Sequence, residues 1–217
     1  MKTLRTIPLL IALIVLSVTQ NTVANDDKFV VVMQKNIEAV YKAETIEDLQ
    51  ASVNAFERIG EAEKTKWEPQ YYAAFGYLMM TTRTSDGPKK DAWIDLAMKA
   101  IAKAKTLAPG ESEVFALEGF AYMMRLTVDP ASRGAQYSGM SMESYNKALA
   151  LNPENPRALA LLAQMQYGTA QFFGSSTAEA CTTANTAIGK FEIYKSENPL
   201  SPAWGKGMAE EMRNNCQ

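Results

Sequence analysis

The feature that most constrains the fold of this chain is a helical pattern that recurs three times in the same register. A small residue stands in one helix of each unit, at Gly76, Gly119 and Ala163, with spacings of 43 and 44 residues. A proline closes each unit: Pro109, Pro153 and Pro199. A period in this range, built from paired helices, is typical of a solenoid in which each pair buries its apolar face only against its neighbours. The sequence therefore predicts an all-α superhelix.

The small residues belong to a longer pattern of aromatic and apolar positions. The first helices of the units read Tyr72-x2-Phe75-Gly76-x2-Met79, Phe115-x2-Glu118-Gly119-x2-Tyr122 and Leu159-x2-Leu162-Ala163-x2-Gln166. The second helices read Ala97-x3-Ile101-x2-Ala104, Ser141-x3-Tyr145-x2-Ala148 and Ala187-x3-Phe191-x2-Tyr194. This pattern resembles the tetratricopeptide repeat, whose motif W-x2-L-G-x2-Y, A-x3-F, P describes one helix-turn-helix unit. Glu118, Ser141 and Gln166 depart from that motif.

Each unit is longer than the usual tetratricopeptide repeat, and the extra residues fall between its two helices. We therefore expect long second helices of about 20 residues, or about 30 Å, with a break in the middle one at Gly134 or Gly139. The apolar periodicity predicts about four helix pairs and a C-terminal capping helix. The expected helices cover residues 27–43, 46–63, 69–82, 88–107, 111–126, 130–151, 155–168, 177–196 and 201–215.

The first residues have the pattern of a secretory signal peptide. Lys2 and Arg5 precede an apolar stretch at residues 7–18, and Thr22-Val23-Ala24 supplies small residues for cleavage. The apolar stretch is too short to span a bilayer. We therefore expect residues 1–24 to be a signal peptide and residues 25–217 to form one helical domain, which is periplasmic or secreted and has no membrane anchor after cleavage.

The composition argues against several kinds of chemistry. The sequence contains no histidine, which removes the commonest general base and the usual ligand of transition metals. Two cysteines alone cannot make a zinc site, and a net charge of −2 over 217 residues argues against a nucleic-acid partner. We expect no catalytic residues, no metal and no cofactor, and hence a protein that is not an enzyme.

The resemblance to tetratricopeptide repeats implies a concave groove lined by the first helices. Carried over position by position, it places Gln70, Ala73, Tyr77 and Met80, then Glu113, Ala116, Phe120, Met123 and Met124, then Arg157, Ala160, Gln164 and Tyr167 on this groove. Methionine and tyrosine suit an adaptable binding surface. The ligand-binding candidates are Tyr77, Met80, Phe120, Met123, Met124, Arg157, Gln164 and Tyr167. The alternative is that the large apolar members pack in the core against the long second helices.

A second candidate surface is the edge formed by the inserts. Residues 134–139 and 169–174 share an Ala-Gln-aromatic sequence, with Tyr137 in one and Phe172 and Phe173 in the other. Repeated loops on one edge of a solenoid often bind a partner. The alternative is that each aromatic ring covers the end of its own helix pair.

These surfaces lead to three candidate functions. The first is an exported, non-enzymatic scaffold or adaptor that binds a protein or peptide through the groove or the insert edge. The second is a small-ligand carrier, in which the long second helices close an apolar pocket, and the third is a structural subunit of an envelope complex. The segments Asn155-Pro156-Arg157 and 199–205 also resemble exported, uncharacterised tetratricopeptide-like proteins of the Bacteroidetes, a resemblance that implies no known activity.

The two cysteines are expected to form a disulfide bond. An exported protein resides in an oxidising compartment, where an even number of cysteines is commonly paired. If the chain reverses at Pro199, Cys181 lies 18 residues before the turn and Cys216 lies 17 residues after it. Two antiparallel helices would bring these positions side by side, so the bond would hold the closing helix to the last long helix.

Overall fold

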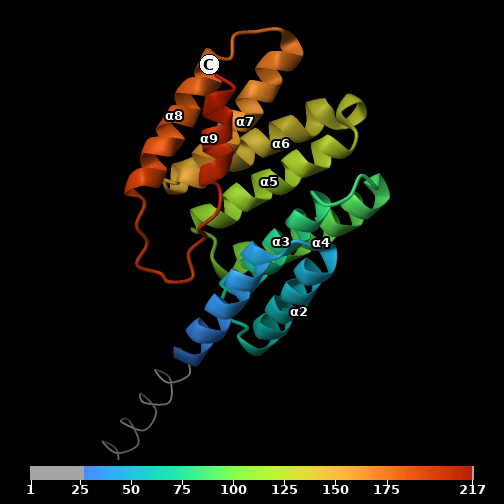
Figure 1. Cartoon of the computed structure of the whole chain (residues 1–217), viewed down its shortest axis with the longest axis vertical. Helices are drawn as coiled ribbons and strands as arrows, with labels where there is room; N and C mark the ends of the chain where they lie inside the picture. Colours follow the sequence, from blue (N-terminus) through green and yellow to red (C-terminus); the bar gives the residue numbers. More distant parts are fainter. Residues whose placement is uncertain (1–26, 217) are drawn as a thin grey trace, which may run out of the picture.

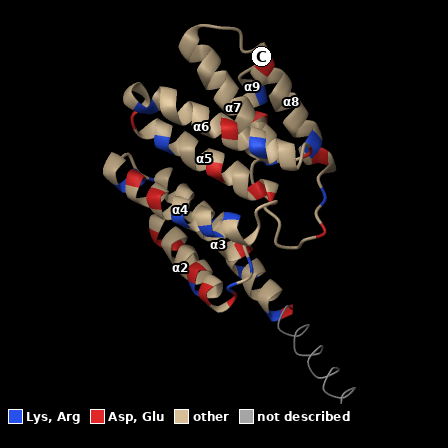
Figure 2. Cartoon of the chain, turned by 180° about the vertical axis from the view of Figure 1, so that it is seen from behind, with Lys and Arg blue, Asp and Glu red and all other residues tan. Residues whose placement is uncertain are grey.

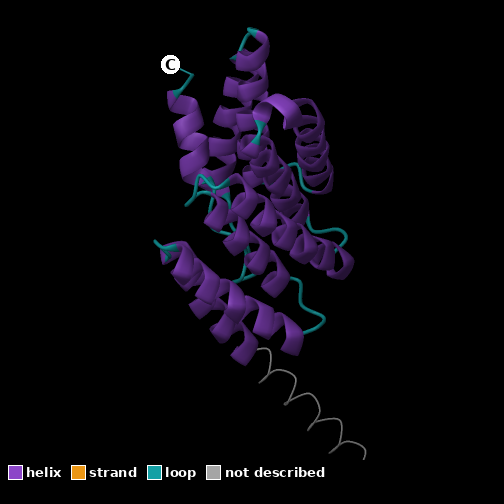
Figure 3. Ribbon diagram, turned by 90° about the vertical axis from the view of Figure 1, so that its right-hand side faces the viewer, coloured by secondary structure: helices purple, strands orange, loops and turns teal. Residues whose placement is uncertain are grey.

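The computed structural model describes residues 27–216, and within that range the chain folds into helices joined by loops (Figure 3). The predicted signal peptide lies outside the described residues. The helices are residues 27–42, α2 (Ile46–Ala62), α3 (Glu68–Thr81), α4 (Gly87–Leu107), α5 (Ser112–Val128), α6 (Pro130–Leu151), α7 (Pro156–Phe173), α8 (Ala178–Ile193) and α9 (Lys206–Asn214). None of these described helices is long and apolar enough to cross a membrane.

The helices stack as successive pairs (Figure 1). The helix at residues 27–42 is followed by α2, then α3 packs with α4, α5 with α6 and α7 with α8. The last helix, α9, packs on both α7 and α8. The predicted all-α superhelix of helix pairs with a C-terminal capping helix is confirmed.

Polar side chains cap the N-termini of most of the helices. Thr45 forms a capping box with Asp48 at the start of α2, and Asp86 and Asp129 accept backbone N–H bonds at the starts of α4 and α6. A proline stands in the first turn of α3, α4, α6 and α7, where its missing N–H is not needed.

The second helices of two pairs have the predicted length, with 21 residues in α4 and 22 in α6. The expected break in the middle helix is wrong, because α6 runs without interruption through Gly134 and Gly139. In the last pair the insert lengthens the first helix instead. The helix α7 continues to Phe173, and Gly174 ends it in the left-handed conformation with a φ of 65°.

A small residue lets the helices of the middle pair approach closely. A Cβ atom added to Gly119 would lie 2.2 Å from Cε1 of Tyr145 on α6, and Ser141 donates a hydrogen bond of 3.1 Å to the Gly119 carbonyl. Gly76 instead faces α2, where an added Cβ would lie 2.6 Å from Cγ2 of Val53. The two glycines therefore serve different contacts: Gly119 packs within its own pair and Gly76 against the preceding pair.

One departure from the repeat motif, Glu118, forms polar contacts with two neighbouring helices. The Glu118 carboxylate pairs with Lys105 of α4 at 2.7 Å and accepts a long hydrogen bond from Ser144 at 3.5 Å. Burial of Glu118 is tolerated because its charge is paired.

The C-terminal end of the chain is tied to the last pair. Cys181 of α8 and Cys216 form a disulfide bond, with 2.08 Å between the sulfur atoms and 5.7 Å between the Cα atoms. The closing helix begins at Lys206 rather than at residue 201 as predicted, because residues 194–205 form a loop containing Pro199 and Pro202. We call residues 194–205 the strap.

We predict opposite effects from alanine at two glycines of the middle pair. Gly119→Ala forces its Cβ against the buried ring of Tyr145 and should lower the free energy of unfolding by about 1–3 kcal/mol. Gly134→Ala in α6 has nothing within 4 Å and should raise it by about 0.5–1 kcal/mol. Urea denaturation of both variants measures this difference, and equal stability of the two would contradict the close approach at Gly119.

Candidate functional site

The strap crosses the surface formed by the first helices of the pairs. Its Leu200 carbonyl accepts a hydrogen bond of 2.8 Å from the Tyr72 hydroxyl on α3. Its Ala203 N–H donates to the Tyr41 hydroxyl on the helix at residues 27–42, at 3.1 Å. Figure 1 shows this connection as a long loop between α8 and α9. We call the surface beneath it, formed by residues 27–42, α3, α5 and α7, the first-helix face.

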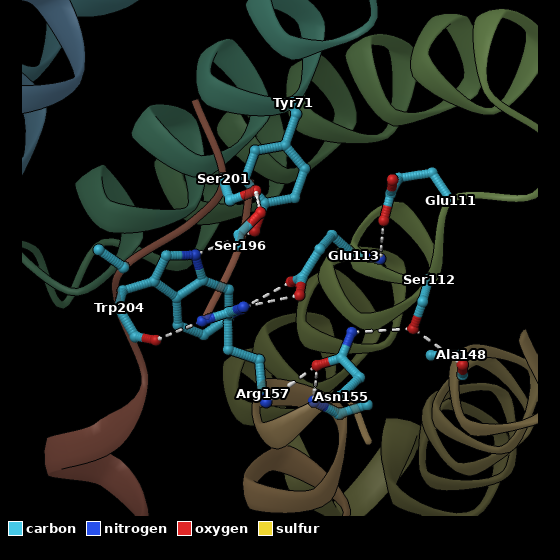
Figure 4. A network of polar contacts seen from close by, with 12 residues as sticks. Tyr71, Glu111, Ser112, Glu113, Ala148, Asn155, Arg157, Ser196, Ser201 and Trp204 are labelled. Atoms are coloured by element: carbon cyan, nitrogen blue, oxygen red, sulfur yellow. Dashed lines mark hydrogen bonds and ion pairs between the residues drawn. The ribbon is translucent and has the colours of Figure 1, made fainter. Parts of the chain in front are cut away.

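Trp204 holds the C-terminal part of the strap on this face. Its ring lies 5.4 Å from the ring of Phe75 and 5.8 Å from that of Phe120, centroid to centroid, and is inclined by 29° to each. The indole N–H donates to the Tyr71 hydroxyl at 3.0 Å (Figure 4). Three helical positions on two neighbouring pairs therefore bind one flat aromatic ring.

A buried ion pair lies beside this ring. The Arg157 guanidinium of α7 donates two hydrogen bonds to the Glu113 carboxylate of α5, at 2.7 Å from Nε and 2.8 Å from Nη2. Its third nitrogen, Nη1, points to the Trp204 carbonyl at 3.4 Å (Figure 4). The Tyr194 ring covers the guanidinium at 4.5 Å. A parallel two-bond contact of this kind is the strongest form of ion pairing between side chains.

Asn155 fixes the position of Arg157. Its side-chain oxygen caps α7 by accepting from the N–H groups of Arg157 at 2.9 Å and Ala158 at 3.0 Å. Its amide nitrogen donates to the Ser112 hydroxyl at 2.8 Å, and this hydroxyl donates to the Ala148 carbonyl, also at 2.8 Å. The start of α7 is thus joined to α5 and α6 by buried hydrogen bonds (Figure 4).

Burial shifts the pKa values of groups around the ion pair. Burial favours the neutral form of Arg157, but the hydrogen bonds and charge of Glu113 outweigh it and raise the pKa of the guanidinium. Burial, with the nearby charges of Glu113 and Glu68, raises the pKa of Glu111. Burial also raises the pKa of Tyr71 well above its usual value. The phenol of Tyr71 therefore stays neutral and accepts the indole hydrogen bond.

The predicted groove residues do not lie on one common surface. Phe120 and Arg157 lie on the first-helix face, beneath Trp204. Tyr77 and Met80 are buried in the core, and the Tyr77 hydroxyl donates to Glu57 of α2 at 2.8 Å. On α3 it is Tyr71, Tyr72 and Phe75 that contact the strap. The face of α3 carried over from the repeat motif therefore turns towards α2 rather than towards the strap.

The remaining groove candidates are partly exposed. Met124 follows Phe120 by one helical turn, and Gln164 lies in the middle of α7. The Met123 sulfur contacts the Tyr145 hydroxyl of α6 at 3.9 Å, so Met123 lies at the contact between α5 and α6. Tyr167 donates to the Asn215 carbonyl beyond α9 at 3.3 Å.

The two predicted insert loops are not equivalent. Tyr137 lies within α6 and stacks on Tyr122 of α5, with 6.2 Å between the ring centroids. Phe172 and Phe173 end α7, where they are 82% and 75% exposed. Tyr137 covers its own helix pair, which is the alternative stated for it, whereas the two phenylalanines project at the end of α7.

Sequence reasoning missed the strap as part of the site. Trp204 was assigned to the closing helix, although the two prolines of residues 199–202 were a signal for an extended segment. The ion pair also had a signal: Glu113 and Arg157 occupy the same motif position in consecutive units, which places opposite charges on neighbouring helices.

The side chains around the strap are mainly aromatic rings and hydrogen-bonding groups. In the described part of the chain no three acidic or cysteine side chains come together as a metal-binding group. Charged side chains of both signs are interspersed along the helices (Figure 2).

Away from the strap, a surface depression of about 310 Å³ opens between α2 and α4. It is lined by Gly60, Glu61, Lys64, Gln70, Lys103, Thr106 and Leu107.

Comparison with known proteins shows a likeness in structure. No protein-family model matches the chain, and no curated protein matches it in sequence. Among solved structures, the HusA haemophore from Porphyromonas gingivalis is similar to this chain, with a TM-score of 0.77 and 26% sequence identity. The likeness covers 86% of this chain and 91% of the haemophore. The fold is thus similar to that of a protein known as a haemophore.

We predict that the ion pair is essential for the stability of this face. Arg157→Met should lower the free energy of unfolding by about 3–5 kcal/mol, because it leaves the Glu113 carboxylate buried without its partner. The double variant Arg157→Met/Glu113→Leu removes both charges and should recover most of that loss. Chemical denaturation of the single and double variants provides the comparison. A double variant as unstable as the single one would show that the ion pair is not the source of the effect.

Proposed function

We propose that the chain is a carrier of a small, flat aromatic ligand of the porphyrin class, with haem as the first candidate. The observation that carries this proposal is the likeness to a haemophore over most of the length of both chains. A haemophore is a binding protein, which supports a carrier and argues against an enzyme. The second candidate function stated from the sequence, a small-ligand carrier, thereby becomes the preferred one.

The first-helix face has the side chains that such a ligand needs. Phe75 and Phe120 provide adjacent aromatic rings, and Met79 and Met124 follow them by one helical turn on the same two helices. Met79 and Met124 are only partly buried and pack against the core. Aromatic and thioether side chains bind a flat apolar ring through contact area and polarisable sulfur. The apolar strip from Phe75 and Phe120 to the methionines is our candidate binding surface.

The strap covers part of the first-helix face, and for this reason we prefer the carrier function to the adaptor function. A protein or peptide partner on the first-helix face would have to compete with the strap, which already contacts the helices there through Leu200, Ala203 and Trp204. A small ring needs less of the face than an extended peptide does. We propose no nucleic-acid partner.

We also propose that the helix pairs are diverged tetratricopeptide repeats and that the chain is exported. The recurring Gly or Ala positions and the close contact at Gly119 support the first proposal. The pattern of residues 1–24 and the disulfide bond between Cys181 and Cys216 support the second. N-terminal sequencing of the protein from its native host tests export, and a retained Met1 would contradict it.

The absence of histidine from the sequence makes a specific prediction about ligand recognition. Haem proteins often hold the iron through an imidazole, which this chain cannot supply. We propose that the aromatic and thioether side chains of the face contact the macrocycle rather than the iron, so iron-free protoporphyrin should bind with a dissociation constant within about threefold of that for haem.

Titration of the purified protein, followed by tryptophan fluorescence and porphyrin absorbance, measures both constants. Binding of neither ligand at micromolar concentration would refute the carrier function. Binding of haem alone would show that the iron is held by a side chain other than histidine, which contradicts recognition through the macrocycle.

A further inference from the structure

We infer that Trp204 occupies the ligand subsite of the first-helix face, and that a ligand binds by displacing the strap from Phe75 and Phe120. The inference rests on the proposed carrier function and adds to it the location of the ring, the chemistry of its edge and the movement that admits it. The subsite accepts a flat aromatic ring system with a hydrogen-bond acceptor at its edge.

The aromatic contacts define the position of the ring. The Trp204 indole lies nearly parallel to two phenylalanine rings that come from different helices, α3 and α5. Phe75 and Phe120 are each 4% exposed with the indole in place. If the indole leaves, it uncovers two large apolar rings, and another flat ring regains the same contact area. Trp204 itself is only partly buried, so its outer surface is open to an approaching ligand.

The polar contacts define the edge of the ring. Nη1 of Arg157 reaches the Trp204 carbonyl at 3.4 Å, whereas the other two guanidinium nitrogens bind Glu113 at 2.7 and 2.8 Å. The contact to the strap is thus the longest hydrogen bond that this guanidinium makes in the site. An acceptor on a ligand, such as a carboxylate oxygen, can take the Nη1 hydrogen at a shorter distance and with charge assistance. The Tyr71 hydroxyl is left to bind a polar atom at the opposite edge.

Leu200 anchors the strap in the hydrophobic core, and a few hydrogen bonds hold the rest, so the strap remains attached when its Trp204 end lifts. Between its ends, backbone groups bind side chains at Tyr72 and Tyr41, and Asn198 donates to Glu68 at 3.3 Å. No helix or sheet ladder fixes it within residues 194–205.

The C-terminal end of the strap stays attached to the helices. Gly205, with a φ of 103°, links it to α9, and the disulfide between Cys181 and Cys216 keeps α9 on α8. The Trp204 end of the strap can therefore leave the face while the helices at both ends of the strap stay in place.

Removal of the indole tests this inference directly. In the full chain, Trp204→Ala should bind iron-free protoporphyrin about tenfold or more tightly than the unmodified protein, because the apparent dissociation constant is the intrinsic one divided by the fraction of molecules with an open site. The gain should come from faster association. Trp93→Ala removes the same side chain from α4, away from the strap, and should leave the constant within about twofold.

Weaker binding by Trp204→Ala would show that the indole belongs to the binding surface, and unchanged binding would place the ligand elsewhere. Either result overturns the inference while leaving the carrier function standing. Failure of the unmodified protein, Trp204→Ala and Trp93→Ala alike to bind protoporphyrin would refute the carrier function itself.

A second measurement does not depend on a variant that folds. In hydrogen-exchange mass spectrometry of the unmodified protein, addition of protoporphyrin should speed exchange in residues 196–204 and slow it in α3 and α5. Slower exchange in residues 196–204 would show that the strap closes over the ligand instead of leaving the face, and would overturn the displacement.

Discussion

The ion pair between Glu113 and Arg157 is the interaction on which the first-helix face depends. It joins α5 to α7, and Asn155 and Ser112 extend it by hydrogen bonds to α6. Because a buried guanidinium needs hydrogen-bond partners, the remaining nitrogen turns to the Trp204 carbonyl of the strap. The buried cation thus links two helix pairs and contacts the strap that crosses them.

The strap covers part of the first-helix face, which limits the kind of ligand that this face suits. An open row of first helices offers a furrow suited to an extended peptide, but here residues of the chain itself fill part of it. The covered part combines phenylalanine rings with one guanidinium hydrogen-bond donor, which suits a flat ring with a polar edge. Thioethers at Met79 and Met124 continue the apolar surface beyond Trp204. Fold and side chains together therefore favour a small carried ligand over a protein partner.

The repeat pattern predicted the helix pairs and the long α4 and α6, because these depend on local periodicity. It misplaced the face of α3, because Gly76 packs against Val53 of the preceding pair and not within its own. The position of the strap on the first-helix face could not be predicted from local sequence. Its position depends on contacts such as that between Tyr41 and Ala203, which lie 162 residues apart, and a proline-containing loop has no period that would indicate such a partner.

A crystal structure of the chain with protoporphyrin bound tests the central claim most directly. The macrocycle should lie against Phe75 and Phe120, with an acidic group near Nη1 of Arg157 and with the Trp204 indole displaced from both rings. A macrocycle bound at the exposed Phe172 and Phe173 at the end of α7, with the strap unmoved and Trp204 still on Phe75, would contradict it.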